Sequence, residues 1–107
     1  MYRVTTPTHT FKLPMETSTL LVIQVVYKQQ KTKLKKQYQN NTLPDGMTLE
    51  GKNVVIRLTQ EETKQFVADD YVKTQIRVLT NAGDAYASKT FSIYVNDVLD
   101  EEILFDD

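Results

Sequence analysis

The chain has no cysteine and no tryptophan, and it has only three glycines, three prolines and one histidine among 107 residues. Without cysteine it has no disulfide, no thiolate metal site and no cysteine nucleophile. The low glycine and proline content argues against a disordered or fibrous chain, and three scattered glycines cannot build a phosphate-binding loop. A fold made from this sequence therefore depends on side-chain packing alone, and its length suits one domain.

Long apolar runs are also missing. The longest one covers residues 20–27, is interrupted by Gln24, and is too short to cross a membrane. The first 14 residues lack the apolar centre and the small-residue cleavage site of a signal peptide. We therefore expect no signal peptide and no membrane partner.

Alternating apolar and polar residues, separated by turn residues, dominate the chain and indicate β-strands. The strands are predicted at residues 8–13, 20–29, 33–39, 47–50, 53–58, 71–80 and 85–96. About seven strands at this spacing predict an all-β sandwich over residues 1–96. We expect the strand at 20–29 to be buried largely on both faces, and the lysine-rich strand at 33–39 to form an exposed edge.

The stretch LTQEETKQF, residues 58–66, predicts one short helical crossover near residues 60–66. Thr59 and Glu62 have the spacing of a capping box, and acids in a first helical turn are favoured by the helix dipole. Glu61 and Glu62 point apart on a helix, so they are expected to be structural and not to share a metal or a proton. Phe66 and Val67 are expected to pack beneath the core.

Charge is unevenly distributed along the chain. Residues 1–44 have a net charge of +6, residues 45–96 a net charge of −1, and residues 97–107 have six acids and no base. Five lysines lie within nine residues: Lys28, Lys31, Lys33, Lys35 and Lys36. Because this run has no arginine and the whole chain is slightly acidic, it favours a solvated edge or a protein-binding surface, and we expect no nucleic-acid partner.

Residues 97–107 form a separate C-terminal arm in which apolar residues interrupt the acids. These apolar residues are Val98, Leu99, Ile103, Leu104 and Phe105. The arm is either a solvated tail or a segment that docks on its own domain or on a neighbour. Together with the lysine run, these five residues are the predicted partner-binding set. A calcium site is not expected here, because a calcium loop places its oxygen ligands around a glycine.

Catalytic, metal and cofactor sites are not predicted anywhere in the chain. His9 is the only histidine, whereas a zinc site needs three or four nitrogen, sulfur or oxygen ligands, so His9 is expected at the surface or in packing. The six tyrosines leave carbohydrate binding open, because tyrosine combines a flat face with a polar tip. Tyr86 and Tyr94 have the same parity on one predicted strand, which would place them on one outward face.

The order of elements in residues 58–96 resembles the last three strands of an immunoglobulin-like sandwich with its helical crossover. The Asp69-Asp70-Tyr71 stretch resembles the tyrosine corner of that fold, although Tyr71 has the parity of Lys73 and Arg77. The chain lacks the cysteine pair and the tryptophan of antibody domains. The predicted fold is therefore an immunoglobulin-like β-sandwich outside the antibody type.

A more specific resemblance rests on the motifs TPTHTF, VVYKQ, LTQEET, QIRVLTNAG and VNDVLDEEI. These resemble small structural proteins of tailed bacteriophages of gut Firmicutes, and residues 53–96 are similar in style to the N-terminal β-sandwich of phage baseplate upper proteins. The resemblance implies a non-enzymatic phage or prophage virion protein of the tail, baseplate or head, made in the bacterial cytoplasm. Its partners would be other virion proteins or itself. A carbohydrate- or cell-surface-binding module is the alternative.

Overall fold

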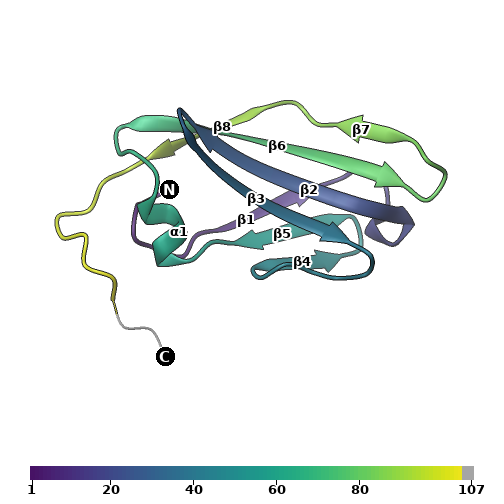
Figure 1. The fold of residues 1–107 in the computed structure, drawn as a ribbon, viewed down its shortest axis with the longest axis horizontal. Helices are drawn as coiled ribbons and strands as arrows, with labels where there is room; N and C mark the ends of the chain where they lie inside the picture. The colour runs from purple at the N-terminus through teal and green to yellow at the C-terminus, as the bar shows by residue number, and fades with distance from the viewer. Residues whose placement is uncertain (105–107) are drawn as a thin grey trace.

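The computed structural model describes residues 1–104, which form a sandwich of two antiparallel sheets (Figure 1). The elements are β1 (Thr8–Lys12), the 3-10 helix η1 (Thr17–Thr19), β2 (Leu20–Gln29), β3 (Thr32–Gln39), β4 (Met47–Glu50), β5 (Asn53–Arg57), α1 (Gln60–Lys64), β6 (Asp70–Thr80), β7 (Ala85–Ala87) and β8 (Phe91–Val95). The predicted all-β class and the short helix between two strands are confirmed.

The strand order is that of an immunoglobulin-like sandwich. The smaller sheet runs β1-β5-β4, and the larger one runs β3-β2-β6, with β7 and β8 both paired to the far side of β6. These strands occupy the places of strands B, E and D in one sheet and C′, C, F and G in the other. Strand A has no full counterpart in residues 1–104, where Tyr2 makes a single parallel bridge to Asn96.

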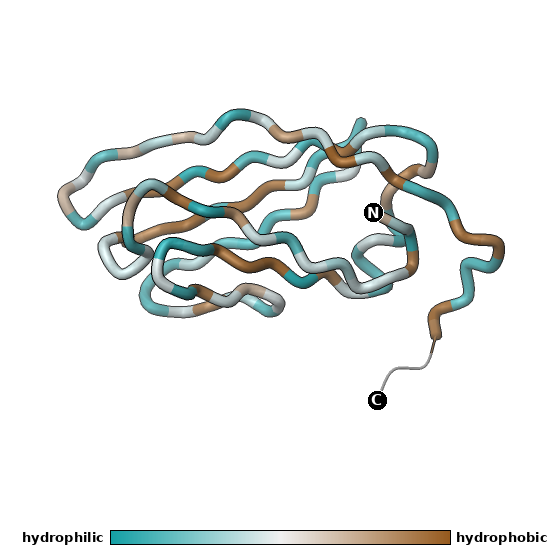
Figure 2. The backbone as a smooth tube through the Cα atoms, turned by 180° about the vertical axis from the view of Figure 1, so that it is seen from behind, coloured by the Kyte–Doolittle hydropathy of each residue, from teal (hydrophilic) through white to brown (hydrophobic). Residues whose placement is uncertain are grey.

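Apolar residues recur along the strands (Figure 2), and the buried ones pack together as one core between the two sheets. The core consists of Leu13, Leu20, Ile23, Val25, Tyr27, Met47, Val54, Ile56, Leu58, Phe66, Val72, Ile76, Val78 and Val95. The predicted edge position of the lysine-rich strand, β3, is confirmed. The expectation that β2 is buried on both faces is wrong: Val22 and Val26 are only half-buried, because they point away from the smaller sheet.

A β-bulge divides the last predicted strand into β7 and β8. Arg77 pairs with Ala87 and Thr74 pairs with Phe91, so two residues of β6 lie opposite three residues of the edge strand. Ser88 fills the irregularity, because its Oγ accepts from the amide of Ile76 at 3.0 Å and its own amide donates to the Ile76 carbonyl at 2.8 Å. Residues 1–104 therefore form eight strands where about seven were predicted.

The bulge also changes which side chains share a face. Residues directly opposite in an antiparallel pair point the same way, and Tyr86 lies opposite the core residue Val78 whereas Tyr94 lies opposite Tyr71 on the outer face. One extra residue reverses the parity of every side chain beyond it. The prediction that Tyr86 and Tyr94 share one outward face is therefore wrong.

Helix α1 begins with the predicted capping box. The amide of Glu62 donates to Thr59 Oγ1 at 3.1 Å, and the amide of Thr59 donates to Glu62 Oε1 at 2.9 Å. Phe66 is buried beneath the core as predicted, but Val67 is 52% exposed. Val67 is held by its backbone instead, because its amide and carbonyl both bond to the side-chain amide of Gln29.

Replacing the capping threonine, Thr59→Ala, is expected to lower the free energy of unfolding by about 1 kcal/mol, because it removes the acceptor for an otherwise unpaired helix amide. Urea denaturation followed by far-UV circular dichroism measures this change. Ser18→Ala, which removes a hydroxyl at an exposed position of η1, is the control. An equal loss of stability in both variants would contradict the role of the cap.

Candidate functional site

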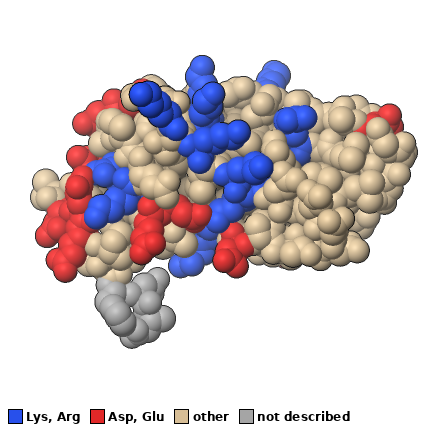
Figure 3. All heavy atoms as spheres, in the orientation of Figure 1, with Lys and Arg blue, Asp and Glu red and all other residues tan. Residues whose placement is uncertain are grey.

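The outer face of the larger sheet is strongly basic. Its outward strand positions hold five bases and no acid; the bases are Lys28, Lys33, Lys35, Lys73 and Arg77, which we call the basic face. Uncharged Gln24, Gln37 and Gln75 lie among them. In the space-filling view, basic side chains gather over the middle of the molecule and acidic ones over the end that carries the arm (Figure 3).

Three of these lysines form one row across three strands. Lys28 on β2 lies directly opposite Lys33 on β3 and directly opposite Lys73 on β6. Like charges directly opposite on neighbouring strands destabilise a sheet. The row therefore repels itself in the free protein, and an acidic group placed over it would relieve that repulsion.

The structure divides the predicted lysine run. Lys28, Lys33 and Lys35 lie on the basic face, and Lys31 is exposed in the turn between β2 and β3. Lys36 points inward and is buried, with its Nζ atom 2.6 Å from Oε2 of Glu62. Lys36 therefore joins edge strand β3 to the cap of α1 and takes no part in the face.

Lys73 and Arg77 complete the basic face, although neither belonged to the predicted partner-binding set. Their shared parity on β6 was visible in the sequence. What sequence alone did not show was that β6 pairs directly with β2, which places both residues beside the lysines of β2 and β3.

The C-terminal arm docks on its own domain as far as Leu104. Val98 and Ile103 are half-buried, and the amide and carbonyl of Leu104 bond to the side-chain amide of Gln60 at 2.8 and 2.9 Å. Leu99 is fully exposed and Leu104 is 71% exposed. Phe105 lies outside the described residues. Of the predicted alternatives, the structure shows docking in cis, and contact with a neighbour stays a prediction.

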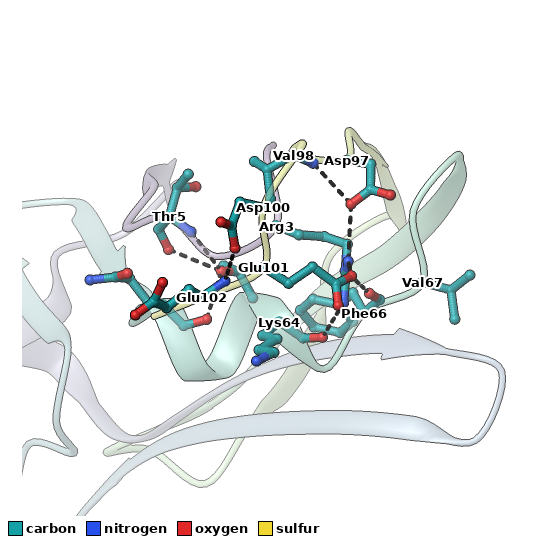
Figure 4. A network of polar contacts seen from close by, with 12 residues as sticks. Arg3, Thr5, Lys64, Phe66, Val67, Asp97, Val98, Asp100, Glu101 and Glu102 are labelled. Carbon is teal, nitrogen blue, oxygen red and sulfur yellow. Dashed lines mark hydrogen bonds and ion pairs between the residues drawn. The ribbon is translucent and has the colours of Figure 1, made fainter. Parts of the chain in front are cut away.

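Arg3 anchors the base of this arm, and sequence reasoning missed it (Figure 4). Its Nε atom donates to the Phe66 carbonyl at 2.7 Å and its Nη2 atom to the Lys64 carbonyl at 3.0 Å. Its Nη1 atom donates to Asp97 at 3.0 Å and also to Glu101. One guanidinium thus joins the N-terminal segment, the end of α1 and the arm.

The electrostatics of this cluster favour its charged state. The hydrogen bond to Glu101 raises the pKa of Arg3, and the amide of Val98, followed by Arg3, lowers the pKa of Asp97. A cation beside the last carbonyls of a helix is also favoured by the helix dipole. The partners lie more than 90 residues apart in sequence, so no local motif could have revealed them.

His9 has a packing role that links the two sheets. Its Nδ1 atom and the hydroxyl of the fully buried Tyr27 share a hydrogen bond of 2.8 Å, joining β1 to β2. Burial lowers the pKa of His9, with a smaller effect from the N-terminal ammonium, and burial raises the pKa of Tyr27. Within residues 1–104, no three His, Cys, Asp or Glu side chains are placed to hold a metal ion together.

Among the described residues, no helix has the length and apolar character needed to cross a membrane. Comparison of the chain with protein-family models, with curated proteins and with solved structures finds no match. The resemblance to phage structural proteins therefore stays a prediction.

Stability is expected to fall as the pH drops below about 6.5, the ordinary pKa of histidine. His9 stays neutral to a lower pH in the folded chain than in the unfolded chain, so the unfolded chain binds more protons in this window. Urea titrations from pH 7 to pH 5 measure the free energy of unfolding, which should fall with pH in the wild type. This slope with pH should disappear in His9→Gln. It should persist in Tyr27→Phe, which leaves the histidine buried. A slope unchanged in His9→Gln would argue against this origin.

Arg3→Met is expected to release the arm, because methionine fills similar space but donates no hydrogen bond. Heteronuclear ¹⁵N NOE values of residues 98–104 should drop, while those of the strands stay high. Arg3→Lys should give a partial drop, since an ammonium cannot reach all four acceptors with the geometry of a guanidinium. Lys52→Met, at an exposed turn, is the control; equal NOE values in Arg3→Met and in this control would refute the anchor.

Proposed function

We propose that this protein is a non-enzymatic structural component of a tailed phage or prophage particle, and that it acts through protein–protein contacts. The observation that carries the contact is the self-repelling lysine row, Lys33, Lys28 and Lys73, within a face that has no acid at its outward strand positions. The motifs that resemble phage structural proteins supply the biological setting. Its location would be the virion, in the tail, the baseplate or the head.

The basic face suits an acidic protein surface better than nucleic acid. Four of its five bases are lysines, its neighbours are mainly glutamines, and the chain has a net charge of −1, which disfavours approach to a polyanion. Carboxylates of a neighbouring virion protein, or of a second copy, would neutralise the row residue by residue. Such a contact would determine orientation and partner choice more than affinity.

A carbohydrate-binding module remains the second candidate, on a different residue pair from the one expected. Tyr71 and Tyr94 lie side by side on the outer face, with ring centroids 5.2 Å apart, and the Tyr94 hydroxyl donates to Asp69 at 3.2 Å. Exposed aromatic rings beside a carboxylate are groups that a sugar can stack on and bond to. Glycan-array binding that disappears in Tyr94→Ala would favour this candidate.

The assembly proposal is tested in particles purified from the phage or prophage whose genome encodes this chain. Mass spectrometry should detect the chain in the particle. The variant Lys33→Glu with Lys73→Glu should enter the particle about tenfold less or worse, because an attractive row becomes a repulsive one. Lys31→Glu with Lys52→Glu makes the same change in net charge at exposed turn residues and should enter normally.

Two results would count against the proposal, and they differ in meaning. If the wild-type chain is missing from the particle, the structural role is wrong. If both charge-reversed variants enter equally well, the role survives but the basic face is not the contact.

A further inference from the structure

Within residues 1–104, no strand covers the opening along one side of the sandwich. Strand β1 at the edge of one sheet and β7–β8 at the edge of the other flank two cavities of about 570 and 650 Å³. The cavities share the lining residues Leu13, Pro14, Ile76 and Ser88, so they lie next to each other, and together we call them the inter-sheet groove.

The groove is apolar and partly uncovered. Ile76 and Val78 form its buried floor, while Tyr86 is 55% and Phe91 45% exposed on its rim. Phe91 reaches across to Phe11 on β1, with ring centroids 6.1 Å apart. Of the residues lining either cavity, only Lys12 carries a charge, and exposed Lys89 follows Ser88 in the bulge.

The edges of the groove are poorly suited to receive another β-strand. A bulge, an edge lysine and a proline are the features by which natural edge strands discourage pairing, and the groove has the bulge at residues 88–90, Lys12 and Pro14. A ligand for this groove would therefore insert apolar side chains and would not extend the sheet.

We propose that the inter-sheet groove receives the exposed leucines of the C-terminal arm, Leu99 and Leu104, from a second copy of this chain. Arg3 and Gln60 hold the arm on its own domain with these two side chains directed to solvent, so little conformational freedom is lost when they bind. The exposed acids Asp100 and Glu102 lie beside them, and their charge is opposite to that of Lys12 and Lys89 at the groove.

In the docked state the arm lies away from the Tyr86 part of the groove of its own domain (Figure 1). The arm leaves at one end of the long axis, and β7, with the Tyr86 part of the groove, lies at the other end in both views (Figures 1 and 2). A donor at one end and an acceptor at the other make a head-to-tail contact, which builds a ring if it closes and a filament if it does not.

This inference names self-association as one contact of the proposed assembly protein, and it is tested on the purified full-length chain alone. Its failure therefore leaves incorporation into a particle, and the basic face, as separate questions. Two leucines make a small interface, and small interfaces are typically weak, so measurements should extend to a chain concentration of about 1 mM.

Light scattering is the first measurement. The mass of the wild-type chain should rise with concentration, and Leu99→Ser with Leu104→Ser should stay monomeric. Leu21→Ser with Leu43→Ser removes two other exposed leucines and should associate like the wild type. A wild-type chain that stays monomeric at about 1 mM would overturn the proposal.

Cysteine cross-linking then locates the contact, because the chain has no cysteine of its own. A tagged Leu104→Cys chain mixed with a Tyr86→Cys chain should form a mixed disulfide under mild oxidation. Mixing it instead with Ser92→Cys, on the outer face of β8, should give at least about tenfold less. Preferential cross-linking to Ser92→Cys would place the arm on the outer face and refute the groove.

Discussion

Burial of two sheet faces against each other holds this protein together, and the rest of the structure depends on it. The chain has no cysteine to make a disulfide, and fourteen buried core residues lie between the sheets and at their ends. Burying a side chain such as Val, Ile or Phe contributes about 1.5–3 kcal/mol, so no single polar contact equals this sum. The polar contacts act at the ends and edges instead, where the apolar layer runs out. There Lys36 forms an ion pair with Glu62 and Arg3 binds the arm, whereas His9 bonds to the hydroxyl of the buried Tyr27 between the sheets.

Much of the fold could be predicted because its causes are local. Residue patterns and turn residues located β1 to β6 to within a few residues but merged β7 and β8 into one strand, and the Thr59–Glu62 spacing located the only α-helix of residues 1–104. The lysines of β3 indicated its edge position, since charge at an edge opposes stray pairing. Each of these signals lies within a window of about ten residues.

The features that could not be predicted depend on register or on distant partners. Lys36 has the parity of Leu34 and Tyr38, but the carboxylate that allows its burial belongs to Glu62 on α1, 26 residues further along the chain. Arg3 finds its acids more than 90 residues away. By contrast, the failure of the tyrosine-corner resemblance was visible in the sequence, because Tyr71 has the parity of Lys73 and Arg77; it is exposed on the outer face, where it packs against Tyr94. The basic face was partly predictable. The sequence shows which residues of a strand share one side, but it does not show which strands are neighbours in the sheet.

The bulge at residues 88–90 allows β7 and β8 to pair with β6 in two different registers. A regular edge strand would have only one register along its whole length. The register of β7 is determined by the hairpin at residues 81–84, and the register of β8 is determined by burial of Val95 in the core. Because the extra residue absorbs the mismatch between these two registers, β7 can follow the hairpin while β8 keeps Val95 in the core. The bulge therefore lets the tip of the domain and the body of the sandwich each keep the register that its own contacts require.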